Sequence, residues 1–361
     1  MTDVPTFGIE EEFFVVDSDG KLAARGADIL DGAEHAKGEL QQELTRTQAE
    51  TATGICRRYD DALEQLGSMR AGLAEAAGQR GYRLLPSGCP PLAEDNLPTI
   101  TPSPRYERMA AHFGATARTS LTCGCHVHVA VPDRETGVGV IAKIRPWLPV
   151  LLTVTANSAI ADGYDTGYSS WRYQQWSRWP SAGPPPRLTS LAEYEGVVDA
   201  WMRAGAILDR GMVYWDVRLA EKQPTIEFRM GDVAATPAEA VLLAVLIRGL
   251  VSMALADETP PPYLSSEVLR AHLWRASRAG LTGQVPDPRT GDLAPAPRLL
   301  EDLVELTKPA LAEAGDLEFA RAGLARLVAE GGGADRQRQC FARRGRAEDV
   351  VDLLTEASTK P

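Results

Sequence analysis

The stretch GIEEEFFVVD at residues 8–17 places three consecutive glutamates in a segment that otherwise has the composition of a buried strand. A charged side chain is costly to bury unless it is paired with an opposite charge or binds a metal ion. Successive side chains of a strand point to opposite faces, so Glu10 and Glu12 share one face while Glu11 lies on the apolar one. We therefore expect a sheet with one polar and one apolar face, although an edge strand with a solvated surface would also fit this segment.

Two other predicted strands carry polar residues at positions i and i+2. They contribute His126 and His128 in one strand, and Glu227 and Arg229 in the other. Antiparallel sheets often have one solvated face, which could by itself produce such pairs. Glutamate and histidine, however, are ligands for divalent metals, and carboxylate oxygens with an occasional imidazole suit Mg²⁺ or Mn²⁺. If the three strands belong to one sheet, these residues predict a face that binds metal ions and phosphate.

A further pair of glutamates, Glu43 and Glu50, lies in the segment ELTRTQAETAT. Their spacing puts both side chains on one face of a helix but on opposite faces of a straight strand. The threonines favour extended structure. Both side chains therefore reach one site only if the chain bends between them, and a solvated surface is the alternative.

The sequence CGCH at 123–126 contains the residue types of a zinc site. Its C-x-C spacing differs from the usual C-x2-C, and no second pair follows. Two ordinary buried thiols are therefore the preferred interpretation.

The rest of the chain is a mixture of helices, strands and irregular segments. Apolar periodicity and turn signals predict helices over 60–78, 106–113, 147–160 and 191–208, a mostly helical region from about 264, strands at 6–17, 83–85, 126–131 and 225–230, and irregular segments at 89–104 and 163–186. Thr236, Pro237 and Glu239 form a typical helix start before the apolar run 241–256. Because Arg248 interrupts this short run, we expect a buried helix and not a membrane span.

The composition excludes some classes of function. The chain has 361 residues, a formal charge of −11 and an isoelectric point of about 5.1. This acidic balance argues against general nucleic-acid binding, which needs a basic surface. The start MTDVPTFG lacks the basic and apolar regions of a signal peptide. With five cysteines, an odd number, we expect reduced thiols and a cytoplasmic location, with no membrane partner.

Taken in order, these segments resemble the carboxylate–amine ligase family of type 2 glutamate–cysteine ligase-like proteins, which are relatives of glutamine synthetase. The motifs that carry the resemblance are GIEEEFFVVD, E-x6-E at 43–50, CHVHV at 125–129, ANSAIADGYDTGYSSWR at 156–172, WPSAGPPP at 179–186, WDVRL at 215–219, PTIEFRMGD at 224–232 and GLTGQVPDPRTGD at 280–292. They cover nearly the whole chain.

The resemblance implies an α+β fold, in which a curved, largely antiparallel sheet carries helices on its outer face, as in the catalytic domain of glutamine synthetase. It implies one catalytic domain over residues 1–361, with a ligase core at about 5–260 and a mostly helical part at about 261–361. It also implies a reaction in which ATP phosphorylates a carboxylate, typically the γ-carboxylate of glutamate. An amine then attacks the acyl phosphate to give an amide, ADP and phosphate.

Roles for individual residues follow from the same resemblance. It implies two clusters that bind Mg²⁺ or Mn²⁺, the first made of Glu12, Glu43 and Glu50, and the second, which grips the ATP phosphates, made of Glu10, His126 and Glu227. It further implies anion-binding roles for Arg229, Arg218 and Arg172. His128, on the face of His126, either touches a bound substrate or nucleotide or is a hydrogen-bonded neighbour.

Aromatic residues gather in the irregular segment 163–186. Trp171, Tyr173, Trp176 and Trp179 could stack on adenine, shape an amine pocket or pack the loop. The glycines and prolines around them suggest a lid that excludes water from the acyl phosphate.

Two features depart from the family pattern. Glu11 is a charge on the apolar face, and Ser87-Gly88-Cys89-Pro90 stands where some relatives have Gly-Thr-His-Pro. We expect small amino-acid or amine substrates and consider a homodimer, but the identities of acid and amine stay open. A metal-dependent hydrolase that activates water and a non-catalytic binding homologue are the alternatives.

Overall fold

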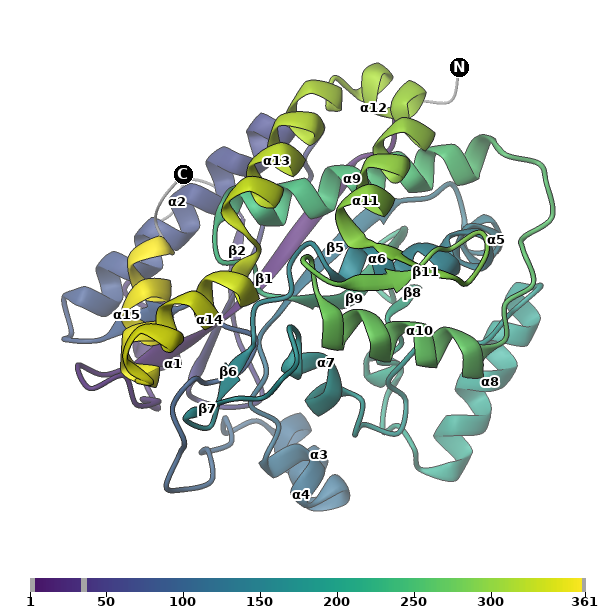
Figure 1. Ribbon diagram of the computed structural model, residues 1–361. Helices are drawn as coiled ribbons and strands as arrows, with labels where there is room; N and C mark the ends of the chain where they lie inside the picture. Colours follow the sequence, from purple (N-terminus) through teal and green to yellow (C-terminus); the bar gives the residue numbers. More distant parts are fainter. Residues whose placement is uncertain (1–3, 34–37, 359–361) are drawn as a thin grey trace.

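The computed structural model describes residues 4–33 and 38–358 and contains one large sheet. Its strands are ordered β2-β3-β1-β5-β9-β8, with β4 paired to β1 outside this path, and all these pairings are antiparallel. The strands are β1 Phe7–Val16, β2 Glu39–Gln42, β3 Gln48–Ala52, β4 Arg83–Leu85, β5 Gly124–Ala130, β8 Val217–Leu219 and β9 Thr225–Asp232. The predicted α+β fold with a largely antiparallel sheet is confirmed (Figure 1).

Most other elements are helices. They are α1 Gly26–Leu30, α2 Tyr59–Gly78, α3 Pro104–Phe113, α4 Ala115–Arg118, α5 Arg134–Ile144, α6 Leu148–Leu152, α7 Trp171–Trp176, α8 Leu191–Ala204, α9 Pro237–Ala256, α10 Ser266–Ala279, α11 Ala296–Leu306, α12 Lys308–Ala314, α13 Leu317–Glu330, α14 Gly333–Arg344 and α15 Ala347–Ala357. Short 3-10 helices span Arg145–Trp147 (η1) and Arg210–Met212 (η2), and two small hairpins pair β6 Ile160–Ala161 with β7 Tyr164–Asp165 and β10 Gln284–Pro286 with β11 Leu293–Pro295.

Helices α2 and α9 cover the apolar face of the sheet (Figure 1). As predicted, α9 begins after Thr236, whose side-chain oxygen accepts a hydrogen bond from the Glu239 amide at 3.3 Å. Among the described residues α9 alone is long and apolar enough to cross a membrane, but 83% of its most apolar window is buried inside the protein. Its Arg248 pairs with buried Asp316, so α9 is a core helix that carries a compensated charge.

The charge of Glu11 on the apolar face is fully compensated. Arg70 of α2 donates from Nε to Glu11 Oε2 at 2.9 Å, and both side chains are 0% exposed. Arg70 also donates to the backbone carbonyls of Ala234, Ala235 and Ser358. The departure noted in the sequence is therefore a buried ion pair that ties β1, α2 and the C-terminal helix end together.

The prediction of a helix over 147–160 is wrong beyond Leu152, where α6 ends. Thr153 and Val154 close a last turn on Val150 and Leu151, and from Asn157 the chain bonds to β9. Asn157 donates its amide to Asp232 Oδ2 at 2.8 Å, and the Ser158 hydroxyl donates to the same oxygen at 2.7 Å. The buried carboxylate of Asp232 thus holds residues 157 and 158 in a non-helical conformation. The predicted helix 191–208 also ends early, at Ala204, because Gly205 adopts a left-handed conformation with φ of 70°.

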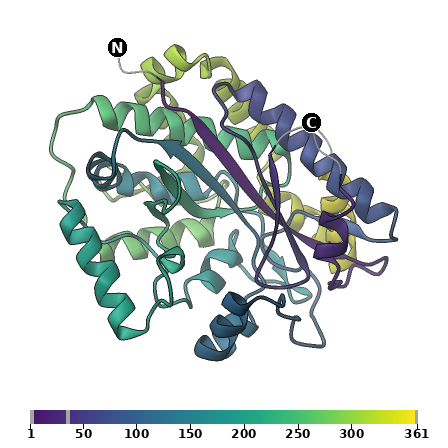
Figure 2. The same ribbon diagram turned by 180° about the vertical axis from the view of Figure 1, so that it is seen from behind.

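Helices α3 and α7 contribute side chains to a cavity on the polar face of the sheet, and both lie in the lower part of Figure 1. Seen from behind, the strands cross one another at an angle, which shows the twist of the sheet (Figure 2). The C-terminal part is mostly helical, and α12 and α13 pack against α9. The single-domain organisation stays a prediction.

Candidate active site

Strand register places predicted metal ligands opposite one another on the polar face. Glu10 of β1 pairs with His126 of β5, and Glu12 of β1 pairs with Glu50 of β3. Because β1 lies between β3 and β5, residues distant in sequence meet around its two even-numbered glutamates. The interpretation of the stretch GIEEEFFVVD as one wall of a site thus agrees with the register.

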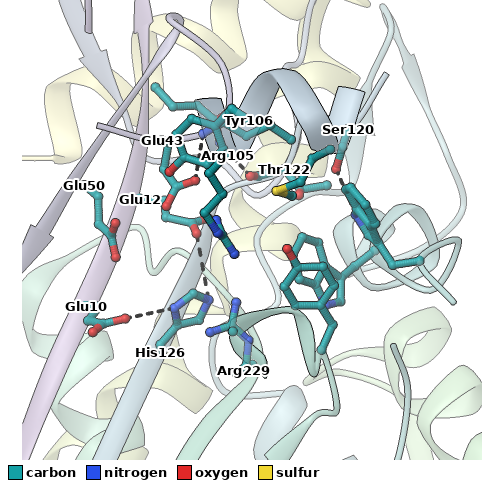
Figure 3. Close-up of a pocket in the computed structure, with 17 residues that line it drawn as sticks. Glu10, Glu12, Glu43, Glu50, Arg105, Tyr106, Ser120, Thr122, His126 and Arg229 are labelled. Carbon is teal, nitrogen blue, oxygen red and sulfur yellow. Dashed lines mark hydrogen bonds and ion pairs between the residues drawn. The ribbon is translucent and has the colours of Figure 1, made fainter. Parts of the chain in front are cut away.

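A cavity of about 150 Å³ opens on this face (Figure 3). Five of the six predicted metal ligands and one predicted arginine line it, namely Glu10, Glu12, Glu43, Glu50, His126 and Arg229. The rest of the lining is Leu44, Gln48, Arg105, Tyr106, Met109, Ser120, Thr122, Trp176, Trp179, Gly211 and Tyr214. The cavity therefore has an acidic end on the sheet, and aromatic, hydroxyl and arginine side chains form the rest of its wall.

The chain bends between Glu43 and Glu50, as a shared site requires. Glu43 directly follows β2 and Glu50 lies in β3, which pairs with β2 in antiparallel register. Inside the turn, the Thr45 hydroxyl donates to Gln48 Oε1 at 2.6 Å, and Gln48 Nε2 donates to the Thr122 carbonyl at 2.9 Å. These bonds hold the turn so that both glutamates face the cavity.

The acidic end contains three carboxylates without a cationic partner. No lysine or arginine in the described chain forms an ion pair with Glu12, Glu43 or Glu50. Burial raises the pKa of Glu12 and of Glu50, and the charge of Glu43 raises both further. The Gly124 amide donates to Glu12 at 2.6 Å and offsets only part of this effect. Such crowding of like charges is relieved when a cation binds.

Both histidines contact Glu10. His126 Nδ1 lies 3.2 Å from Glu10 Oε2, and His128 Nε2 lies 3.2 Å from Glu10 Oε1. Burial alone would raise the pKa of Glu10, but the hydrogen bonds and charges of the histidines outweigh it and hold this pKa below its ordinary value. His128 Nδ1 lies 3.0 Å from the Thr225 hydroxyl, which orients its ring. In the described part of the chain His126 Nε2 is buried without a hydrogen-bond partner, which suits a metal ligand.

Glu227 lies between two arginines. Arg218 Nε donates to it at 2.7 Å, and Arg229 forms a second ion pair with its other oxygen. Burial would raise the pKa of Glu227, but the charges of Arg218 and Arg229 hold it well below its ordinary value. Arg218 and Glu227 do not line the cavity, whereas Arg229 does.

Arg172 is buried beside the cavity and outside its lining. Its side chain donates to the carbonyls of Arg229 and Met230 at 3.3 and 3.4 Å, and the residue is 1% exposed. A Cβ atom at Gly124 would lie 2.2 Å from Arg172 Nη2. Gly124 is therefore needed for close packing next to Glu12. In the sequence, only its position inside the motif CGCH at 123–126 pointed to this glycine.

Two sets of three ligand atoms lie within 4.8 Å of one another. One set is Glu10, Glu50 and His126, and the other is Glu10, His128 and Glu227. These sets share Glu10 and differ from the two clusters that the family resemblance implied. Which residues bind an ion stays a prediction, but neither set contains a cysteine, and the thiols of CGCH are simply buried.

Only some of the aromatic residues in the segment 163–186 line the cavity. Trp176 and Trp179 line the cavity, while the Tyr173 hydroxyl donates to buried Asp216 at 3.0 Å. Trp176 packs on Tyr214 with ring centroids 4.7 Å apart. These contacts favour a pocket wall, and the proposed lid motion stays a prediction.

Sequence analysis missed several lining residues that come from outside the strands. They are Arg105, Tyr106 and Met109 on α3, Ser120 and Thr122 before β5, and Tyr214 before β8. No local pattern marks them, because their approach to the sheet depends on how α3 and the loops fold over it.

Comparisons with known proteins identify the family. The Glutamate-cysteine ligase family 2 (GCS2) matches residues 6–357. The chain is 51% identical over 351 residues to "Putative glutamate–cysteine ligase 2-1" of Rhodococcus jostii (strain RHA1), which covers 96% of this chain and 95% of the relative. It is 47% identical over 363 residues to "Putative glutamate–cysteine ligase 2-2" of Mycobacterium sp. (strain KMS), covering 99% of this chain and 100% of the relative.

Solved structures share the fold at low sequence identity. A bifunctional glutathione synthetase from Pasteurella multocida superposes with a TM-score of 0.70 at 15% identity, covering 98% of this chain and 52% of that protein. A glutamate–cysteine ligase from Francisella tularensis in complex with AMP superposes with a TM-score of 0.62 at 11% identity, covering 98% and 88%. The match over residues 6–357 and the similarity to full-length relatives place the chain in glutamate–cysteine ligase family 2, as an ATP-dependent carboxylate–amine ligase.

Proposed function

We propose that this ligase forms an amide through an acyl phosphate. The γ-phosphoryl group of ATP passes to a substrate carboxylate oxygen, which leaves ADP. The amine nitrogen attacks the acyl carbon, the bond to phosphate breaks, and loss of a proton from nitrogen gives the amide. Glutamate, through its γ-carboxylate, is the proposed acid, and cysteine or another amino compound is the proposed amine. The names of relatives at 51% and 47% identity support this choice.

One observation supports the proposal most strongly. Five of the six predicted metal ligands line one cavity, and the sixth, Glu227, has a carboxylate oxygen within 4.8 Å of ligand atoms of Glu10 and His128. An enzyme that moves a phosphoryl group works mainly through positioning and electrostatic stabilisation. A face rich in carboxylates, imidazoles and guanidinium groups offers both.

The acidic end fits divalent cations. We propose that two or more Mg²⁺ or Mn²⁺ ions bind among Glu10, Glu12, Glu43, Glu50, His126, His128 and Glu227. Their oxygen and imidazole donors suit these ions. Such ions, when bound, neutralise charge on the transferring phosphoryl group.

The guanidinium groups of Arg229 and Arg218 are proposed to hold anionic oxygens of the substrates. Arg229 faces the cavity, and Arg218 is fixed by Glu227 and by the carbonyls of Gly211 and Val213. Planar guanidinium groups grip carboxylate and phosphate through paired hydrogen bonds. Arg172 and His128 are proposed to assist at the phosphate side. A cytoplasmic location and a homodimer stay predictions.

ADP release in the presence of Mg²⁺ tests the function. Purified protein is mixed with ATP and pairs of amino acids and amines, and products are identified by mass spectrometry. We expect ADP release only when both an acid and an amine are present, together with the mass of their amide.

Metal-dependent cleavage of a substrate without ATP would contradict the proposal in favour of a hydrolase. ATP binding without turnover for glutamate and the common amino acids and amines would contradict it in favour of a binding protein. Glu12→Gln is the inactive control, and Glu330→Gln, an exposed change on α13, is the matched control.

A further inference from the structure

The cavity has few cationic side chains other than those paired with Glu227. Among its described lining residues only Arg105 and Arg229 are cationic. Arg229 is paired with Glu227, and Arg218 and Arg172 lie outside the lining. Arg105 is therefore the lining guanidinium that lies apart from the strands of the acidic end.

A single carboxylate fixes Arg105. Its Nε donates to Asp209 Oδ2 at 2.9 Å and its Nη2 donates to Asp209 Oδ1 at 3.3 Å. These two bonds use the side edge of the guanidinium group. Nη1 has no hydrogen-bond partner in residues 4–33 and 38–358, so the end edge formed by Nη1 and Nη2 is available. The side chain is 40% exposed and lines the cavity from the Tyr106 side (Figure 3).

The surroundings favour an anionic ligand at this place. Arg105 Cζ lies 5.7 Å from the centre of the Tyr106 ring, and Tyr214 lines the same cavity. Glu12, Glu43 and Glu50 line the same cavity, but among the described residues none of them forms an ion pair with Arg105, whose one ion pair is with Asp209. The free edge of Arg105 is thus open to a substrate carboxylate that does not react, while the reacting group binds at the cations proposed for the acidic end.

The size of the cavity suits a small substrate. Its volume of about 150 Å³ lies below the roughly 300–1,000 Å³ typical of sites for drug-sized ligands. A cavity of this size suits a small amino acid that has one reacting group at the proposed cations and one carboxylate at Arg105.

We propose that Arg105, oriented by Asp209, binds the non-reacting carboxylate of an amino-acid substrate and so determines specificity. This inference rests on the proposed ligase function and deepens it, because it restricts the acid or the amine to molecules with a free carboxylate. Two sources share this chemistry: the α-carboxylate of the acid and the carboxylate of the amine. Bidentate recognition of a carboxylate is the geometry for which a guanidinium group is suited.

Paired substrates that differ only in this carboxylate test the proposal. The acid arm compares glutamate with 4-aminobutyrate, and the amine arm compares cysteine with 2-aminoethanethiol. For Arg105→Gln we expect KM to rise roughly 10- to 100-fold for the carboxylated member of one arm, the range for hydrogen bonds to a charged group. KM for the member without the carboxylate should not change. The arm that responds identifies the source.

Three further variants separate a role of Arg105 in substrate binding from a role in stabilising the fold. Arg105→Lys should restore part of the affinity, because it keeps the charge but loses the fork. Asp209→Asn should raise the same KM by a smaller factor, because it loosens the guanidinium group. Arg321→Gln is the control, since Arg321 is 41% exposed and likewise pairs with carboxylates. Arg321→Gln should leave KM unchanged both for the substrates with the carboxylate and for those without it.

Equal KM changes for both members of each arm, or no change in either, would overturn the inference while leaving the ligase function intact. If wild-type protein turns over no pair, the proposed function fails instead. Calorimetric titration of glutamate and cysteine into wild type and Arg105→Gln then still decides the inference, because equal affinities would contradict it. A thermal unfolding curve for each variant shows whether the fold is kept.

Discussion

Glu11 and Glu12 are consecutive in β1 but lie on opposite faces of the sheet, and their surroundings differ. Glu11 is 0% exposed, but Arg70 donates to both of its carboxylate oxygens and uses its remaining donors on backbone carbonyls. Glu12, on the other face, has a raised pKa and no ion pair with lysine or arginine among the residues that the structure describes. A buried charge with a complete set of partners stabilises one conformation, whereas a buried cluster of like charges is retained for its chemistry. Partners, more than burial, distinguish Glu11, whose charge is compensated, from Glu12, for which we propose a role in metal binding.

Arg70→Met should give the largest effect, on stability. It leaves the charge of Glu11 buried without a partner, which costs about 3–5 kcal/mol of unfolding free energy. Urea denaturation followed by circular dichroism measures it. The double variant Arg70→Met with Glu11→Leu should recover most of the loss. If Arg70→Met is as stable as wild type, the ion pair of Glu11 does not stabilise the fold, which would contradict this comparison of Glu11 with Glu12.

Glu12→Gln should give the next largest effect, on activity. Loss of one preorganised electrostatic group costs a factor of ~10² or more in rate, by analogy with removal of an oxyanion-hole donor. Steady-state ADP formation with saturating Mg²⁺ measures the rate. The same variant should unfold no more easily than wild type, because the change removes repulsion with Glu43. Lower stability with unchanged activity would reverse the assignment of the two faces.

Gly124→Ala should disturb the functional face by packing alone. The new Cβ atom would lie 2.2 Å from Arg172 Nη2 and 3.1 Å from His126 Nε2, so the Arg172 side chain must move. Overpacking of this kind costs about 1–3 kcal/mol. We expect both the midpoint temperature of thermal unfolding and the rate of ADP formation to decrease. Gly139→Ala is the control, because a Cβ atom there would meet nothing within 4 Å. Wild-type behaviour would show that Arg172 is free to move.

The pH dependence of stability should give the smallest effect. The pKa of Glu50 is raised in the folded protein, so its protonated form stabilises the fold and this contribution is lost as the pH rises above about 4.5 toward the folded pKa. Each unit of the shift is worth about 1.4 kcal/mol. Buried Asp216, with its pKa raised to about 7, acts in the same direction.

The difference between wild type and Glu50→Gln isolates the contribution of Glu50. Without divalent cations, the unfolding free energy of wild type should fall relative to that of the variant as the pH rises from 4.5. Addition of Mg²⁺ should remove this difference by stabilising the ionised carboxylates. Parallel curves for the two proteins at all pH values would contradict the picture of an uncompensated acidic cluster.

Much of the fold could be predicted because it depends on local patterns. Alternation of polar and apolar residues predicted β1, β5 and β9, and the capping residues before Pro237 predicted the start of α9. The prediction failed at residues 153–160, which follow the end of α6 at Leu152 and are tied to β9 by a long-range bond from Asn157 to Asp232. No sequence pattern near that helix contains this information.

The candidate site divides in the same way. The sequence by itself determined which side chains of each strand share a face, because alternation is a local property of extended backbone. Only the tertiary structure decided which of them meet: the register that sets Glu12 against Glu50, the pairing of Glu11 with Arg70, and the approach of Arg105 from α3. Those contacts join segments far apart in the chain, and packing of the whole core selects them.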